Sequence, residues 1–235
     1  MMEQIFQPKP GYKMRLVLLF SGGASVLKYL LANDPNHNHK YQFVGSFTNK
    51  KGVLGIELAQ QAGVPVEVID YHDFVREQKT NFSDRAVRSQ YFERVVKILE
   101  SWKPDLIMHS GFMLIATEPY LSRFQNKILN VHPADLTILD EQGRRKYAGL
   151  HVVEKAFEAG DTSTRSTIHL VTEGVDEGPI IALSEPLNIT PGTSPQEHQE
   201  KMKGACDGPA YQKALELISG GRVWIDTTSN TISVR

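Results

Sequence analysis

The stretch that decides the fold runs from Arg15 to Leu31 and reads RLVLLFSGGASVLKYLL. Its first part, Arg15–Phe20, is a short apolar run of the kind that forms a buried strand, and it ends at a glycine pair. In Ser25–Leu31 the apolar residues stand three and four positions apart, as on one face of a helix. A strand, a glycine-rich turn and a helix in this order predict the start of a β-α-β unit.

The same alternation of short apolar runs and helical segments continues along the first half of the chain. It predicts a doubly wound α/β fold with a mostly parallel sheet. Further strands are expected at Phe43–Phe47, Val66–Ile69, Asp105–His109 and Ile128–Val131, and further helices at Gly52–Gln61 and at Arg85–Trp102, which Asp84 would cap.

The second half has a different pattern. Ser166–Thr172 and Ile180–Ile189 are longer apolar segments joined by a short glycine-containing link, so they are expected to form an antiparallel extension of the sheet. Pro195–Gly220 predicts a helix that is interrupted near Gly208. A small strand is expected after it, at Val223–Ile225.

The length of 235 residues suits one large domain. We expect residues 14–235 to form it, with a phosphate-binding half at 14–125 and a catalytic half at 126–235. The first 13 residues contain two prolines and lack the apolar core of a secretory signal. They are therefore expected to form a loose arm.

Composition narrows the class of protein. The chain is 40% hydrophobic, and its formal net charge of -1 argues against nucleic acid or an anionic membrane as the main partner, since both draw on a surplus of Lys and Arg. No apolar run approaches the roughly 20 residues of a membrane-spanning helix. The eight histidines lack the spacing of metal ligands, and one cysteine allows no internal disulfide. We expect a cytoplasmic protein without a metal, as a monomer or homodimer.

The first candidate site is the turn between the first strand and the first helix. Its backbone N–H groups point at whatever binds over the helix N-terminus, a position that suits a phosphate. The turn lacks the three glycines of the dinucleotide fingerprint and the Lys-Ser/Thr ending of a P-loop. A tight turn that only needs glycine torsions is an equal alternative. The residues concerned are Gly22, Gly23, Ala24 and Ser25.

The second candidate site is Asn130-Val131-His132-Pro133, at the carboxyl end of the fifth strand, where open α/β sheets bind their ligands. Asn130 and His132 are two positions apart, so in an extended segment both side chains lie on one side. An amide and an imidazole that converge in this way can polarise a carbonyl and hold the oxyanion formed on it. For either residue alone, a loop-capping hydrogen bond is the competing interpretation.

The third candidate site is the acidic turn Glu173–Pro179 between the two later strands. Asp176 could raise the proton affinity of His132 and collect a proton from an attacking amine through a water molecule. His169, on the preceding strand, could support the site from behind. The alternatives are a solvated acidic hairpin and an ordinary core histidine.

Five motifs at compatible spacing, covering about Met14 to Ile225, resemble those of the glycinamide ribonucleotide formyltransferase family. They are the glycine-rich first turn, Gly111-Phe112-Met113, Asn130-x-His132-Pro133, Tyr147-x-Gly149-Leu150-His151 and Val175-Asp176-x-Gly178-Pro179. The resemblance implies the Rossmann-like formyltransferase fold. It also implies transfer of a formyl group from 10-formyltetrahydrofolate to the amine of a phosphorylated acceptor in purine biosynthesis.

The resemblance assigns roles to the residues. It implies that Asn130 and protonated His132 hold the oxyanion of the tetrahedral intermediate, and that Asp176 positions the water that relays the proton to the departing folate nitrogen. The implied folate contacts are Arg88, Met113, Leu114, Ile115, Ala116, Asn130, Glu173 and Asp176, and the implied acceptor contacts are Gly22, Gly23, Ala24, Ser25, His151 and Asp207.

The departures from the family pattern lie mainly on the acceptor side. Gly23 and Val26 stand where the family has asparagines, Leu114 replaces an arginine, and the loop Thr137–Tyr147 is longer than usual and contains three basic residues. A different anionic amine held by this loop is therefore one alternative. Hydrolysis of the formyl-folate is a second, and a non-catalytic nucleotide-binding module is a third.

Overall fold

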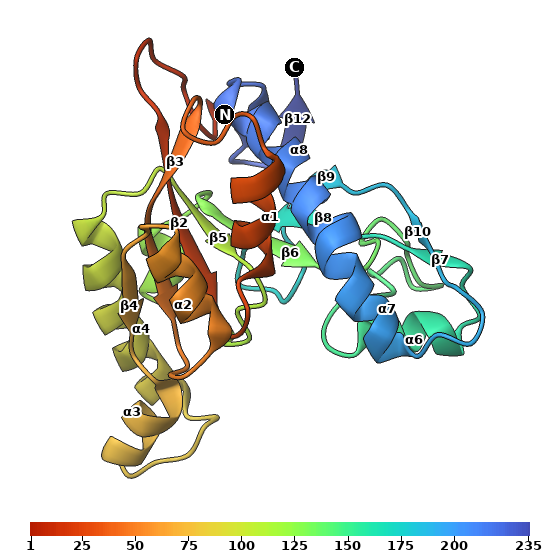
Figure 1. Cartoon of the computed structure of the whole chain (residues 1–235), viewed down its shortest axis with the longest axis horizontal. Helices are drawn as coiled ribbons and strands as arrows, with labels where there is room; N and C mark the ends of the chain where they lie inside the picture. The colour runs from red at the N-terminus through yellow and green to blue at the C-terminus, as the bar shows by residue number, and fades with distance from the viewer.

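The computed structural model describes residues 1–235, and its centre is a seven-stranded sheet (Figure 1). In spatial order the strands are β4 (Val66–Val68), β3 (Tyr41–Thr48), β2 (Met14–Phe20), β5 (Leu106–His109), β6 (Ile128–His132), β8 (Thr167–Leu170) and β9 (Ile180–Leu183). The strands from β4 to β6 pair in parallel, whereas β8 pairs antiparallel with both β6 and β9. The predicted α/β sheet with an antiparallel extension is confirmed.

Strand β2 shows why helices cover both faces of the sheet. Successive side chains of a strand point to opposite faces, and here both sets are buried. Leu16, Leu18 and Phe20 belong to one hydrophobic core, and Val17 and Leu19 to another. The first core is covered by α1 (Ser25–Asn33), α2 (Leu54–Gln61) and α8 (Gly208–Ser219), the second by α3 (Tyr71–Glu77), α4 (Arg85–Ser101) and α5 (Tyr120–Arg123).

The first residues are paired and not loose. Strand β1 (Met2–Gln4) pairs antiparallel with β11 (Val223–Asp226), which in turn pairs with β12 (Thr231–Val234). Phe6 is buried in the first core. The prediction of a loose arm was wrong because its partner strand lies more than two hundred positions later in the sequence. The division into halves at 14–125 and 126–235 stays a prediction.

The second half contains two further corrections. The expected strand Ile180–Ile189 is broken, because β9 ends at Leu183 and β10 (Leu187–Asn188) pairs with β7 (Ser163–Thr164). The short helix α6 (Val152–Glu158) precedes β7 and was not predicted.

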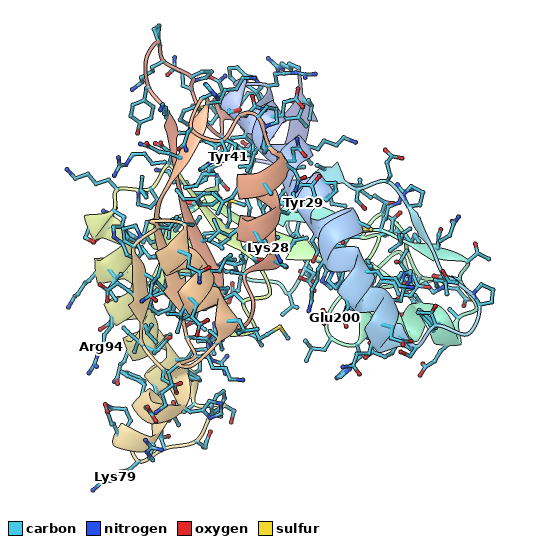
Figure 2. The ribbon with its side chains drawn as sticks, in the orientation of Figure 1. Lys28, Tyr29, Tyr41, Lys79, Arg94 and Glu200 are labelled. Atoms are coloured by element: carbon cyan, nitrogen blue, oxygen red, sulfur yellow. The ribbon has the colours of Figure 1, made fainter.

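The interrupted C-terminal helix is present. It consists of α7 (Pro195–Met202), a π-helical turn over Lys203–Asp207, and α8. Tyr29 lies on α1 (Figure 2). A Cβ on Gly208 would lie 2.2 Å from the Tyr29 ring, so the junction favours glycine, and the Tyr29 hydroxyl donates to Gln212 at 3.2 Å. None of the helices is both long and apolar enough to cross a membrane.

The close approach of α2 to the first turn yields a test of the packing. The N–H of Gly55 donates to the Gly22 carbonyl at 3.1 Å, and a Cβ on Gly55 would lie 2.6 Å from that oxygen and 2.5 Å from the Phe20 ring. We expect Gly55→Ala to lower the free energy of unfolding by about 1–3 kcal/mol, because overpacking forces the backbone to shift. Urea denaturation measures this.

Gly23→Ala is the matched control for stability. A Cβ added at Gly23 would have no other atom within 4 Å, and the φ of this residue is not positive. The urea midpoint of this variant should stay close to that of the wild type. Equal midpoints for the Gly55 and Gly23 variants would contradict the proposed steric constraint.

Candidate active site

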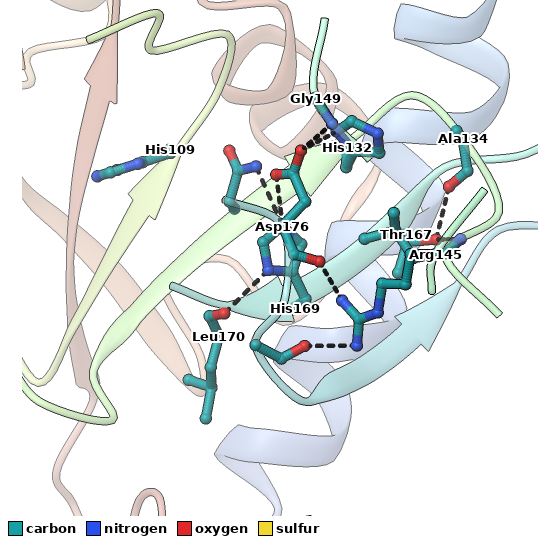
Figure 3. A network of polar contacts seen from close by, with 12 residues as sticks. His109, His132, Ala134, Arg145, Gly149, Thr167, His169, Leu170 and Asp176 are labelled. Carbon is teal, nitrogen blue, oxygen red and sulfur yellow. Dashed lines mark hydrogen bonds and ion pairs between the residues drawn. The ribbon is translucent and has the colours of Figure 1, made fainter. Parts of the chain in front are cut away.

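The pairing of β6 with β8 builds the centre of the site. In the register of this pair Asn130 lies opposite His169, and His132 lies opposite Thr167 (Figure 3). Asn130 and His132 are two residues apart on β6, so their side chains lie on the same face. The antiparallel neighbour thus adds a second imidazole to the amide and imidazole that the sequence predicted.

The Asp176 carboxylate lies between the two imidazoles. Its Oδ2 is 3.3 Å from His132 Nδ1, and its Oδ1 is 3.4 Å from His169 Nε2. His169 Nε2 is also 3.2 Å from Asn130 Nδ2, and its Nδ1 donates to the Leu170 carbonyl at 2.9 Å. The structure therefore brings the predicted trio together, and it adds His169 as a direct contact of both Asn130 and Asp176.

The backbone around Asp176 is specialised. Asp176 has a left-handed φ of 55°, which is uncommon for a residue with a side chain. The N–H of Gly149 donates to Oδ2 of its carboxylate at 2.9 Å. Gly178 cannot be replaced easily, since a Cβ there would lie 1.8 Å from the Leu170 carbonyl oxygen. These contacts fix the carboxylate on the buried side of the turn.

Burial and charge oppose each other in the His132–Asp176 pair. Burial lowers the pKa of His132, and the Asp176 carboxylate and the Tyr147 carbonyl act against this shift. Burial also opposes ionisation of Asp176, but the contacts with His169, His132 and the Gly149 N–H outweigh it and hold the pKa of Asp176 below its usual value. The net effect leaves the pKa of His132 below its usual value, and the ionised Asp176 carboxylate keeps it from falling further.

The two nitrogens of His132 have different partners. Nε2 donates to the Tyr147 carbonyl at 2.7 Å, and Nδ1 faces the Asp176 carboxylate. An imidazolium satisfies both acceptors, because both of its nitrogens carry protons. The arrangement is that of an acid–base pair held at the end of a strand, on the same face as the Asn130 amide.

The glycine-rich turn lies beside the loop that follows β5. Ala24 has a left-handed φ of 49° at the start of α1, where no side chain caps the helix. The Ser21 N–H donates to the Gly111 carbonyl at 3.2 Å, and Ser21 Oγ accepts from the Met113 N–H at 3.0 Å while it donates to Asn49 at 2.6 Å. Turn and loop are thereby held together at one edge of the sheet.

The predicted folate contacts are divided between exposed and buried positions. Met113 and Ile115 are 67% and 55% exposed, whereas Leu114 packs into the core. Glu173 pairs with Arg85 at 3.2 Å, not with Arg88. The guanidinium of Arg88 reaches the Phe82 carbonyl at 3.3 Å through Nη2, and its buried Nε has no partner.

The two polar acceptor-side residues differ in their surroundings. Asp207 accepts a hydrogen bond from Ser166 Oγ at 2.5 Å, and burial raises the pKa of Asp207 to about 6. His151 is 77% exposed and lies 3.6 Å from Glu154. The acceptor roles of both residues stay predictions. No group of three or more His, Cys, Asp or Glu side chains is arranged to hold a metal ion.

Three residues that contact His132 or the Asp176 turn were not predicted as site residues. They are Arg145, Tyr147 and Gly149, which contact the Asp176 turn or His132. The Tyr147-x-Gly149 motif contains two of them, and both make these contacts through backbone atoms. Nothing local in the sequence indicates that Arg145 reaches a turn 31 positions away.

Comparison with known proteins identifies the class to which this fold and site belong. The family model described as formyl transferase matches residues 14–213. The chain therefore belongs to the formyl transferase family. Phosphoribosylglycinamide formyltransferase of Haemophilus influenzae is 31% identical, with 89% of each chain covered.

Other relatives extend the comparison. The trifunctional purine biosynthetic protein adenosine-3 of Drosophila melanogaster is 31% identical over 91% of this chain, and this chain spans 14% of that protein's length. The structure of glycinamide ribonucleotide transformylase 1 from Symbiobacterium toebii superposes with a TM-score of 0.77 at 25% identity, and 95% of both chains is covered. A formyltetrahydrofolate deformylase from Pseudomonas syringae shares the fold, with a TM-score of 0.75 at 17% identity over 95% of this chain and 66% of its own.

The effect of Asp176 on the pKa of His132 can be tested by titration of a variant. In Asp176→Asn the carboxylate is replaced by a neutral group of similar size. Because the carboxylate raises the pKa of His132 against burial, we expect the pKa of His132 to fall further in the variant. Each unit of that fall would correspond to about 1.4 kcal/mol.

NMR titration of the His132 ring measures the shift. Glu177→Gln is the control, since Glu177 is exposed on the same turn and does not shift the pKa of His132. An unchanged or raised pKa of His132 in Asp176→Asn would show that the pair is not coupled as described.

Proposed function

We propose that this protein transfers the formyl group of 10-formyltetrahydrofolate to the amine of glycinamide ribonucleotide in purine biosynthesis. The observation that carries the proposal is the convergence of Asn130, His132 and Asp176 at the carboxyl end of β6. The names of relatives that align along most of this chain support the same substrates. That the enzyme works in the cytoplasm, as a monomer or homodimer, stays a prediction.

The geometry supports direct transfer between the two substrates. The acceptor amine attacks the formyl carbon, and the carbonyl π electrons move to oxygen to give a tetrahedral oxyanion. The Asn130 amide supplies a hydrogen bond to that oxygen, and the His132 imidazolium supplies positive charge beside it. Collapse of the intermediate breaks the bond to the folate nitrogen, and the proton lost by the amine reaches that nitrogen through water held by Asp176.

The remaining contacts are proposed from their places around the trio. We place the acceptor's phosphate on the backbone N–H groups of Gly22–Ser25, at the start of α1. Asp207, in the π-helical turn that packs against α1, would bind the acceptor's hydroxyl groups. The folate ring would lie against the exposed side chains of Met113 and Ile115, with Arg88 nearer the folate tail.

Hydrolysis is the second candidate, because the fold also occurs in a deformylase. A screen of amine acceptors with 10-formyltetrahydrofolate separates the two activities. We expect release of deformylated folate to depend on a phosphorylated amine, with glycinamide ribonucleotide the best acceptor. Release at the same rate without any amine would overturn the transferase and favour the hydrolase. A faster rate with another anionic amine would replace the proposed acceptor.

The role of His132 is tested by truncation. His132→Ala removes the group that stabilises the oxyanion, and formyl transfer should fall to background while folate binding stays largely in place. Turnover is measured with saturating substrates, and folate binding by fluorescence titration. Comparable turnover in an active wild type and the variant would defeat the proposed mechanism. Folate binding without turnover in both proteins would favour the non-catalytic module.

A further inference from the structure

The loop Thr137–Tyr147 is an ordered hairpin. The backbone N–H of Asp140 donates to the Arg144 carbonyl at 2.7 Å. The Asp140 carboxylate closes the tip by accepting from the backbone N–H groups of Gln142 and Arg144, each at 2.9 Å. The chain therefore leaves the hairpin at Arg145 in a fixed direction.

Alternate residues at the end of the hairpin and just after it contact the His132–Asp176 pair through backbone atoms. The Tyr147 carbonyl accepts from His132 Nε2, and the Gly149 N–H donates to the Asp176 carboxylate. The segment itself is held from behind, because Tyr147 is buried and its hydroxyl donates to Asp161 at 2.6 Å. One short stretch of backbone thus reaches both members of the pair.

Arg145 is the first residue of this alternation, and its side chain contacts the backbone of the Asp176 turn (Figure 3). The half-buried guanidinium donates through Nη1 to the backbone carbonyl of Asp176 and through Nη2 to the Gly178 carbonyl at 2.8 Å. A planar guanidinium can hold two acceptors in one fixed geometry, which a single ammonium cannot. The two carbonyls flank Glu177, so the contact fixes the backbone that places the Asp176 side chain.

The other two cations of the loop have different partners. Arg144 is 71% exposed, and its guanidinium pairs with Asp140 at 3.1 Å. Lys146 lies with Nζ 4.8 Å from the centre of the Tyr147 ring. The three basic residues therefore do not form a common anion site, and Arg145 alone points to the catalytic turn.

We propose that Arg145 is a positioning residue, which holds the Asp176 turn in its left-handed conformation so that the carboxylate stays against His132. The loop Thr137–Tyr147 then positions the His132–Asp176 pair and does not bind an anionic acceptor. The kinetic part of the test rests on the proposed formyl transfer. The titration part uses the free protein and does not depend on it.

Two rival explanations give different results for the titration of His132. Among the charged neighbours of His132, Asp176 has the largest effect and raises its pKa, whereas Arg145 has the smallest effect and lowers it, as does His169. If Arg145 positions Asp176, its loss moves the carboxylate away and the pKa of His132 falls. If Arg145 acts only as a charge, its loss leaves the carboxylate in place and the pKa of His132 rises.

The first experiment is an NMR titration of His132 in Arg145→Met, with Arg144→Met as the matched control. Both variants lose one positive charge from adjacent positions of the same loop. We expect a lowered pKa of His132 in the first and the wild-type pKa in the second. A raised or unchanged pKa in Arg145→Met, or the same shift in both variants, would overturn the positioning role.

The second experiment measures formyl transfer in the same variants and in Arg145→Lys. A positioning role predicts a loss of kcat on the order of 100-fold in Arg145→Met, with the KM of the acceptor nearly unchanged. Arg145→Lys should be intermediate, because one ammonium replaces a two-point contact. A raised acceptor KM at unchanged kcat would show acceptor binding instead, and full activity of the lysine variant would show that charge alone suffices.

The two experiments separate the proposal from its assumptions. If wild-type protein transfers no formyl group, the proposed function fails, yet the pKa of His132 in the free variants still decides the role of Arg145. If Arg145→Met does not fold, as judged by circular dichroism, the titration and the kinetics of Arg145→Lys carry the decision. A lysine variant with wild-type pKa and wild-type kcat would then overturn the proposal.

Discussion

The site depends on the contact of the Asp176 carboxylate with two imidazoles, those of His132 and His169. One oxygen faces His132 and the other faces His169, in a place where burial disfavours its charge. The carboxylate stays charged because two imidazoles and the Gly149 N–H contact it. The backbone of Asp176 in this turn is left-handed. The Asp176 carboxylate matters to His132 because that imidazole is buried as well, and the carboxylate raises its pKa against the effect of burial.

The sheet explains why this interaction can exist. Strand β8 pairs antiparallel with β6 and sets His169 opposite Asn130, and the turn between β8 and β9 brings Asp176 back against His132. The parallel strands carry the turn at which we propose the acceptor's phosphate, where Ser21 Oγ joins the glycine-rich turn to Met113 in the loop after β5. The first half of the chain thus contributes backbone groups of the glycine-rich turn, and the second half contributes the ionisable side chains of His132, His169 and Asp176.

Patterns of neighbouring residues in the sequence predicted the features that depend on neighbouring residues. The apolar run Arg15–Phe20 and the alternation of such runs with helical segments predicted the mostly parallel sheet, and the two-residue spacing of Asn130 and His132 predicted that their side chains share one face. Patterns could not predict contacts that depend on distant partners, such as the pairing of β1 with β11 or the reach of Arg145 to the Asp176 turn. The break between β9 and β10 was also missed, because both pieces have the composition of a strand.

The departures from the family pattern take on a physical meaning in the structure. Val26 is fully buried on the inner face of α1, so a side chain at this position contributes packing and not contact with a ligand. Gly23 offers only its backbone. If the acceptor's phosphate binds at this turn, as proposed, the turn recognises charge and shape through N–H groups that any phosphate can use. Discrimination between phosphorylated amines must then come from side chains elsewhere, and Asp207, buried against Ser166 with a pKa of about 6, is the residue for which we propose this role.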